Sequence, residues 1–270
     1  MIKISIITPT WNSERTIERN LKSVGGQTHS SVEHIFIDNC SQDQTKAKVQ
    51  SYYANRVGWI FKSEKDRGIS DAFNKGIATA SGEIIGILNS DDEYWDENVL
   101  SRVAEVFVQN PEVMFVHGDM FFEDKDFGSS LRRPLLCPLT YAMPYNHPTF
   151  FVRKEFYQKY GNFDVTFRFA MDFELVCRMY SSATDCTEKG KYLSDTPMVK
   201  MHAGGASYQY ELKSIDEVEL ALKRHNFWNA NADKEMGLRK LRIRLKRILE
   251  KTHLQFLVKQ WRDWKWGDRT

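Results

Sequence analysis

Residues 84–92 read Ile84-Ile85-Gly86-Ile87-Leu88-Asn89-Ser90-Asp91-Asp92, an apolar run that ends abruptly in polar and acidic residues. A short run of this kind, rich in β-branched residues, is typical of a strand buried on both faces of a sheet. Its two adjacent carboxylates suit a hard divalent cation, Mg²⁺ or Mn²⁺, which takes one or two protein carboxylates and completes its shell with water and substrate phosphate oxygens. Asp91 and Asp92 equally suit the start of a helix over residues 93–100, because acidic side chains interact favourably with the free N–H groups at a helix N-terminus. The pattern by itself leaves both interpretations open.

Similar apolar runs flank this stretch and alternate with helical patterns of period 3.6. The alternation predicts an α/β fold with a mostly parallel sheet joined by crossover helices. The predicted strands cover residues 2–8, 34–38, 57–61, 84–88 and 114–118. The predicted helices cover residues 17–24, 71–80 and 99–107, and a further one covers residues 172–180 beyond a less regular stretch that begins after Asp119.

Polar clusters stand where three of these strands end, at residues 8–12, 38–41 and 89–92. Ligands of open parallel sheets bind beyond the carboxyl ends of the strands, so we expect the clusters to face one cleft. Asp38 fits either a polar turn before the next helix or a hydrogen-bonding contact with a base or ribose. Residues 65–76 add Lys, Arg, Asp and Asn side chains around two glycines.

Composition narrows the class of protein. With 41% hydrophobic and 27% charged residues, the 270-residue chain is expected to be folded and globular. Four cysteines at no metal-ligand spacing favour a reducing compartment, and neither a signal peptide nor an apolar span is recognisable. We therefore expect a cytoplasmic protein.

The C-terminal segment, residues 237–270, carries most of the positive charge. Eleven Lys or Arg against three acidic residues give it a formal charge of +8, which leaves −6 for residues 1–236. Its apolar residues recur at helical spacing and are followed by aromatic ones: Leu238, Leu241, Leu245, Ile248, Phe256, Trp261, Trp264 and Trp266. Such a basic amphipathic helix suits an anionic membrane surface on the inner face of the plasma membrane, or else packs on its own domain with a solvated basic face. The acidic body argues against nucleic acid.

The order of the motifs resembles the family 2 glycosyltransferases of the GT-A fold, many of which build bacterial exopolysaccharide, capsule or lipopolysaccharide. The resemblance is close over residues 2–120 and thinner beyond. It rests on residues 6–12 (Ile-Ile-Thr-Pro-Thr-Trp-Asn), 37–45 (Ile-Asp-Asn-Cys-Ser-Gln-Asp-Gln-Thr), 66–76, 81–83 and 88–92. It implies one GT-A domain over residues 1–236, with a nucleotide-sugar-binding half at 1–120 and an acceptor-side half at 121–236.

The resemblance also implies a donor site. Asn89-Ser90-Asp91 stands where the family has its Asp-x-Asp motif, so Asp91, and with less support Asp92, would bind Mn²⁺ or Mg²⁺. Asn89 departs from the usual Asp, and Asn39 replaces another common acid, which leaves the identity of the nucleotide (uridine, guanosine or thymidine type) open. The implied nucleotide-sugar contacts are Thr8, Pro9, Thr10, Asn12, Asp38, Asn39, Lys65, Asp66, Gly68, Asp71, Asn74, Asn89 and Ser90.

The family has a catalytic carboxylate at the start of a helix in the second half of the domain. Asp172 corresponds to it, with Glu174 as the second candidate. Asp172 would take the proton of an acceptor hydroxyl as its oxygen attacks the anomeric carbon opposite the leaving diphosphate, which inverts the configuration. His147 and His202 resemble family positions near the donor–acceptor junction. The acceptor would be a glycan or a polyprenyl-linked saccharide of the cell envelope.

Two other classes of protein are alternatives to this enzyme. A non-catalytic nucleotide-sugar-binding module of the same fold is supported by Asn89 alone. A dehydrogenase, nucleotidyltransferase or phosphate-loop protein would need a glycine-rich sequence such as G-x-G-x-x-G after the first strand, and none follows it.

Overall fold

The computed structural model describes residues 1–124, 128–182, 189–194, 196–204 and 210–251. A seven-stranded sheet has the order β10-β6-β9-β4-β1-β2-β3, and a four-stranded sheet has the order β5-β11-β7-β8. The large sheet consists of β1 (Ile4–Thr10), β2 (Val32–Asp38), β3 (Trp59–Ser63), β4 (Ile84–Ile87), β6 (Phe115–Gly118), β9 (Phe151–Arg153) and β10 (Gly190–Leu193). The small sheet consists of β5 (Glu93–Tyr94), β7 (Met120–Glu123), β8 (Ser130–Arg132) and β11 (Val199–His202).

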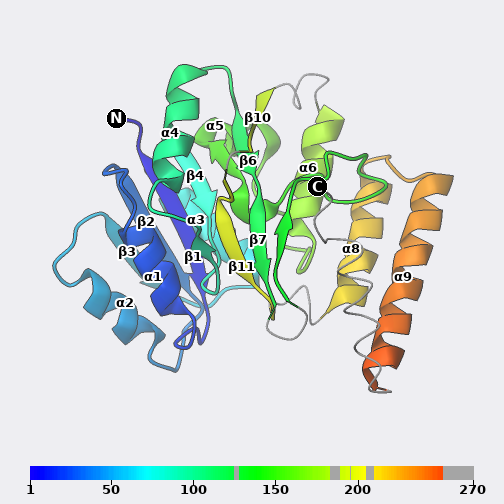
Figure 1. Ribbon diagram of the computed structural model, residues 1–270, viewed down its shortest axis with the longest axis horizontal. Helices are drawn as coiled ribbons and strands as arrows, with labels where there is room; N and C mark the ends of the chain where they lie inside the picture. Colours follow the sequence, from blue (N-terminus) through cyan, green and yellow to red (C-terminus); the bar gives the residue numbers. More distant parts are fainter. Residues whose placement is uncertain (125–127, 183–188, 195, 205–209, 252–270) are drawn as a thin grey trace.

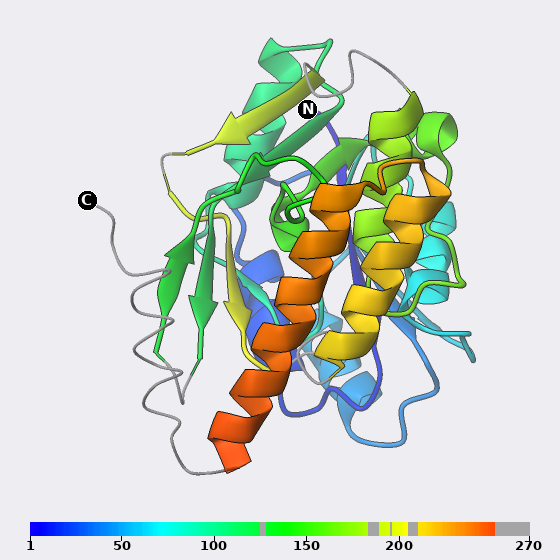
Figure 2. The same ribbon diagram turned by 90° about the vertical axis from the view of Figure 1, so that its right-hand side faces the viewer.

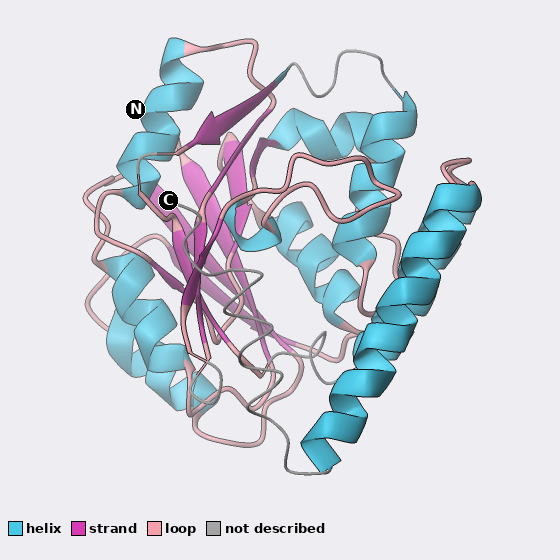
Figure 3. Ribbon diagram, turned by 45° about the vertical axis from the view of Figure 1, so that its right-hand side comes forward, coloured by secondary structure: helices cyan, strands magenta, loops and turns pink. Residues whose placement is uncertain are grey.

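Helices cover both faces of the large sheet (Figures 1 and 3). They are α1 (Ile17–Gly25), α2 (Thr45–Tyr53), α3 (Ile69–Thr79), α4 (Val99–Gln109), α5 (Lys154–Tyr160), α6 (Met171–Ser182), α8 (Glu211–Arg224) and α9 (Ala230–Lys251), with a 3₁₀ turn η1 (His147–Thr149). Pairing is parallel throughout the sheet except at β9, which is antiparallel to β4 and β6. The predicted α/β fold with a mostly parallel, helix-flanked sheet is confirmed.

Side chains of β1 alternate between the two faces of the large sheet, and each face has its own hydrophobic core. Ile4 and Ile6 pack in a core with α4, whereas Ile7 faces the opposite side and packs in a core with α3, α5, α6 and α8. Helix α3 lies very close to β1, because a Cβ added at Gly76 would come within 2.3 Å of the Ile7 side chain. This tight packing fixes the position of the polar segment that precedes α3.

The C-terminal helix α9 begins at Ala230 and continues across the predicted boundary at 236/237. Its first turns are in the core through Ala232 and Met236. Tryptophans 261, 264 and 266 lie outside the described residues. Within the described part of the chain, no helix combines the length and the apolar character needed to cross a bilayer.

The buried carboxylate of Glu33 links the amino ends of β1, β2 and β4 through hydrogen bonds. It accepts hydrogen bonds from the Ser5 hydroxyl (2.7 Å), the Ser81 hydroxyl (2.6 Å) and N–H (2.9 Å), and the Lys3 ammonium (3.1 Å). Burial alone would raise the pKa of Glu33, but the hydrogen bonds from Ser81, Ser5 and Lys3 outweigh it and lower the pKa to about 2.

Glu33→Gln is therefore expected to destabilise the fold by about 2 kcal/mol at pH 7. Because the folded pKa is depressed, the stabilisation is complete above the ordinary pKa of 4.5 and is lost as the pH falls toward about 2. Urea unfolding of both proteins between pH 2 and 7 measures this. The variant should lose less stability on acidification than the parent, and equal losses would contradict the assignment.

Candidate active site

The polar and acidic turn after β4, residues 89–92, is called the acidic corner here. It is held in place by α1 and the loop after β1. Asn20, fully buried on α1, donates its side-chain amide to the carbonyl oxygens of Asn89 (3.0 Å) and Asp92 (3.4 Å). The hydroxyls of Ser13 and Ser90 are 2.9 Å apart. The turn that carries the two carboxylates is thus fixed by side chains about 70 residues away in sequence.

The electrostatics of this corner favour a cation. Burial raises the pKa of Asp91, and burial together with the Asp91 carboxylate raises that of Asp92 well above its ordinary value. Asp92 Oδ2 and Asn89 Oδ1 are buried atoms with no hydrogen-bond partner among the described residues. Carboxylate and amide oxygens are donors that Mg²⁺ and Mn²⁺ accept, so the corner fits such an ion chemically.

The corner offers only a partial coordination shell. Among the described residues, no three His, Cys, Asp or Glu side chains gather in a metal-binding arrangement. A cation bound by Asp91 and Asp92 would therefore take its remaining ligands from water and from phosphate oxygens of a substrate, which is the usual arrangement for Mg²⁺.

Asp38 joins the carboxyl ends of three neighbouring strands. Its carboxylate accepts hydrogen bonds from the hydroxyls of Thr10 (3.0 Å), Ser41 (2.5 Å) and Ser63 (2.6 Å) and from the Ser41 N–H (3.0 Å). The side chain is 1% exposed. The polar turn expected here is therefore present, whereas a contact of Asp38 with a base or ribose stays a prediction.

The segment before α3 is tied to the same edge. Asn39 Oδ1 accepts the Asp66 N–H (3.1 Å), and Asp66 in turn accepts the Gly68 N–H (2.9 Å). Gly68 has φ +126°, a backbone conformation that side chains rarely tolerate, and no atom within 4 Å of an added Cβ. This arrangement leaves open space beside the Asp66 loop.

Other residues that are predicted to contact the nucleotide-sugar donor also lie around this edge of the sheet. Thr8 is fully buried and its hydroxyl lies 3.0 Å from His34 Nε2, so a direct contact of Thr8 with a ligand stays a prediction. Asn12 has φ +48° and accepts the Gln42 N–H at 2.9 Å. The amide of Asn74 is engaged in both directions with the backbone of Phe163 (2.8 and 2.9 Å).

The remaining residues predicted to contact the nucleotide sugar are Lys65 in the loop before α3, Asp71 in α3 and Pro9 in β1. Lys65 accepts a hydrogen bond from the Lys75 ammonium through its carbonyl oxygen (2.7 Å), and Asp71 accepts the Arg67 N–H (3.1 Å) and guanidinium (3.2 Å). Pro9 is half-buried in β1. The roles of these residues at a donor stay predictions.

Asp172 lies in the first turn of α6, where one carboxylate oxygen accepts the Phe173 N–H (2.8 Å). Burial lowers the pKa of His147, and the charge of Asp172 acts in the opposite direction, which places the two side chains near each other. The His147 ring also contacts Phe73 of α3 and Phe163, with centroids 6.0 and 6.2 Å apart. The start of α6, the turn η1 and helix α3 therefore converge.

Glu174, the second candidate, is in a different environment. It is 2% exposed, forms an ion pair with Arg178 (2.7 Å) and lies within hydrogen-bond distance of His225 Nε2 (2.9 Å). A carboxylate that is engaged on both sides in this way is less available for proton transfer, so the geometry favours Asp172.

His202 ends β11 beside the acidic corner. Its backbone N–H lies 3.4 Å from Asp92 Oδ1, and its ring nitrogens lie 3.0 Å from Glu93 and 2.9 Å from Glu123. Neither glutamate could be recognised from the sequence as a partner of His202, because only the pairing of β11 with β5 and β7 brings them to the histidine.

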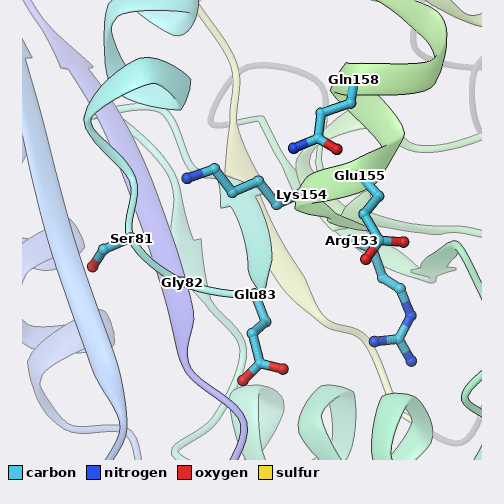
Figure 4. Close-up of a pocket in the computed structure, with 7 residues that line it drawn as sticks. All are labelled: Ser81, Gly82, Glu83, Arg153, Lys154, Glu155 and Gln158. Atoms are coloured by element: carbon cyan, nitrogen blue, oxygen red, sulfur yellow. The ribbon is translucent and has the colours of Figure 1, made fainter.

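A separate cavity of about 260 Å³ lies at the opposite end of the sheet (Figure 4). It is lined by the segment that leads into β4 and by the start of α5. Its two cationic side chains are engaged, since Lys154 donates to the Ala80 carbonyl (2.6 Å) and Arg153 to the Val113 carbonyl (2.8 Å). The cavity is remote from the carboxyl ends of the strands, and we assign no substrate to it.

The comparisons with known proteins identify the family. The sequence model of glycosyl transferase family 2 matches residues 5–177, which include the acidic corner and Asp172. The chain belongs to glycosyl transferase family 2. The match ends before α8, so α8 and α9 lie beyond it.

Two relatives are similar to less than half of this chain. An uncharacterized glycosyltransferase of Nostoc sp. is 34% identical over 119 residues, 43% of this chain and 36% of its own length. The Escherichia coli UDP-Glc:alpha-D-GlcNAc-diphosphoundecaprenol beta-1,3-glucosyltransferase WfgD is 33% identical over 116 residues, 43% of this chain and 45% of its own. The chain thus spans less than half the length of either relative.

Solved structures share the fold. TarS 1–349 of S. aureus in complex with UDP-GlcNAc has a TM-score of 0.67 at 19% identity, over 87% of this chain and 70% of its own. The mannosyltransferase PcManGT of Pyrobaculum calidifontis in complex with GDP-Man and Mn²⁺ has a TM-score of 0.64 at 17% identity, over 97% and 83%. The family 2 chain has the GT-A fold that the sequence analysis expected.

Proposed function

We propose that this family 2 glycosyltransferase moves a hexose from a nucleoside-diphosphate sugar to a glycan or lipid-linked saccharide of the cell envelope, with inversion. The observation that carries the proposal is the acidic corner at the carboxyl edge of the sheet, where Asp91 and Asp92 are adjacent and where Asp92 Oδ2 and Asn89 Oδ1 are buried without a hydrogen-bond partner among the described residues. A bound Mn²⁺ or Mg²⁺ would act there as a Lewis acid toward the leaving diphosphate. TarS with UDP-GlcNAc and PcManGT with GDP-Man and Mn²⁺ support this class of donor.

The chain's own residues supply the rest of the mechanism. Asp172 accepts the proton of the acceptor hydroxyl while that oxygen bonds to the anomeric carbon and the bond to the diphosphate breaks. His147, half-buried and within electrostatic range of Asp172, lines the acceptor side. Asn39 and Asp66 hold the donor loop, and Asn89 presents an amide where a carboxylate is more common. WfgD, whose name states a diphosphoundecaprenol acceptor, supports a lipid-linked saccharide as the acceptor class.

Product stereochemistry tests the direct displacement. With an α-linked donor, NMR of the product should show a β-glycosidic bond, because a single attack opposite the leaving group inverts the anomeric carbon. An α-product would contradict the mechanism. Donor binding with no transfer to any lipid-linked or glycan acceptor would instead favour the non-catalytic module, the alternative that the substitution at Asn89 supports.

We further propose that residues 237–270 attach the enzyme to an anionic membrane surface. One face of α9 packs on α8, with Lys240 bound to Asp216 (2.8 Å) and Lys246 to Glu211 (3.1 Å). The other face exposes a stripe of apolar residues at helical spacing, 50–56% exposed, together with three arginines: Leu241, Leu245, Ile248, Arg242, Arg244 and Arg247. Apolar residues between cations suit an anionic bilayer surface on the inner face of the plasma membrane.

Replacing Leu241, Leu245 and Ile248 together by serine is expected to lower binding to vesicles that contain anionic lipid by about tenfold or more. The fold should be retained, because these side chains are exposed. Sedimentation with the vesicles measures the bound fraction. Val108→Ser on α4, at a site 62% exposed, is the matched control and should bind like the parent. Equal binding of all three proteins would contradict the proposal.

A further inference from the structure

Residues 163–170 form the loop that leads into α6 and so positions Asp172. Helix α3 binds this loop on one side. Asn74 exchanges two hydrogen bonds with the backbone of Phe163 (2.8 and 2.9 Å). The buried hydroxyl of Ser70 donates to the Phe167 carbonyl at 2.7 Å. These contacts fix the beginning and middle of the loop, whereas its last residues depend on another element.

That element is α8, which contributes one carboxylate to three successive backbone N–H groups. Glu217 accepts the N–H of Arg168 (3.0 Å to each oxygen), of Phe169 (2.7 Å) and of Ala170 (2.9 Å). These groups stand directly before α6, at the end of the helix where N–H groups lack intrahelical partners. A negative charge is also favoured at a helix N-terminus.

We propose that Glu217 is a positioning residue for the catalytic base. It does not touch the reacting atoms. It fixes the backbone two to four residues before Asp172, and so fixes where the Asp172 carboxylate meets the acceptor hydroxyl. This inference rests on the proposed role of Asp172.

The shape of the contact explains why glutamate is needed. Only a carboxylate offers two oxygens that accept from all three N–H groups, whereas glutamine would turn an amide NH₂ toward one or more of these donors. Aspartate is one methylene shorter and would leave the hydrogen bonds stretched. Displacing a catalytic group by about 1 Å can lower a rate by about a hundredfold.

The contact also connects the base to the C-terminal helix pair. Asp216 and Glu219, which flank Glu217, both bind Lys240 of α9 (2.8 and 2.9 Å). Helices α8 and α9 lie side by side at one edge of the molecule, with α6 next to α8 (Figures 1 and 2). Helices α8 and α9 lie beyond the residues that the family model matches, so the proposal gives this part of the chain a role in catalysis.

Steady-state kinetics of Glu217→Gln in the full chain test the proposal, with Glu219→Gln as the matched control on the same helix. We expect kcat of Glu217→Gln to fall about 10- to 100-fold while the calorimetric Kd for the donor stays within about twofold. Glu219→Gln should retain kcat, since its partners are Lys223 and Lys240 and not the loop. If Glu217→Gln does not fold, Glu217→Asp serves for the same comparison.

A double variant separates positioning from a merely structural effect. In an Asp172→Asn background, Glu217→Gln should lower kcat no further, because the base that it positions is already absent. A further, multiplicative loss, or wild-type kcat in the single variant, would overturn the inference. If Asp172→Asn itself retained wild-type kcat, the proposed base would be wrong, and this result is distinguishable from a failure at Glu217 alone.

Discussion

Replacing Asp172 with asparagine is expected to lower kcat by about a thousandfold, the middle of the range for loss of a general base. The asparagine keeps the shape of the side chain and can still accept the Phe173 N–H through its oxygen. The donor site is untouched, so the Kd for the nucleotide sugar should stay within about twofold. Single-turnover rates and calorimetric donor binding measure the two quantities.

Glu174→Gln provides the contrast within the same helix turn. Because Glu174 is buried between Arg178 and His225, its loss should lower the melting temperature while the folded protein keeps most of its kcat. A folded Glu174→Gln protein without activity, beside an active Asp172→Asn protein, would reverse the assignment of the base.

Replacing Asp91 with asparagine is expected to lower kcat/KM by about a thousandfold, which corresponds to about 4 kcal/mol of lost transition-state stabilisation. The change removes a carboxylate ligand at a point where the Asp92 carboxylate and the Asn89 amide alone provide a weaker site. Rates measured against Mn²⁺ concentration should show activation in the parent that is weakened or absent in the variant.

Ser90→Ala is the control for this prediction. It removes a hydroxyl that lies 2.9 Å from Ser13 but leaves both carboxylates in place. Its response to Mn²⁺ should resemble that of the parent. Equal Mn²⁺ activation of the Asp91→Asn protein and the parent would show that the acidic corner does not bind the cation.

The parts of the fold that the sequence predicted are those with local signals. Apolar runs ending in polar residues located β1, β2 and β4, with β1 displaced by two residues, and periodicity located α1, α3, α4 and α6. The position of β9 between β4 and β6 has no local signal, because an antiparallel strand inserted from the second half is specified only by tertiary packing.

The same distinction applies to the site. Motif residues such as Asp91 and Asp172 could be predicted from the sequence because their chemistry and order are distinctive. Asn20 and Glu217 were not, because each is an ordinary polar residue on a helix whose partners lie 72 and 47 residues away. Supporting residues of this kind become visible only once the chain is folded.

The measurement that tests the central claim most directly is calorimetric binding of uridine, guanosine and thymidine diphosphate sugars, first with Mn²⁺ and then with a chelator. We expect one nucleotide to bind in the presence of Mn²⁺ and its affinity to fall by at least about tenfold with the chelator, since the cation links the acidic corner to the diphosphate. Binding of none of the three, or equal affinity with and without the cation, would contradict the account.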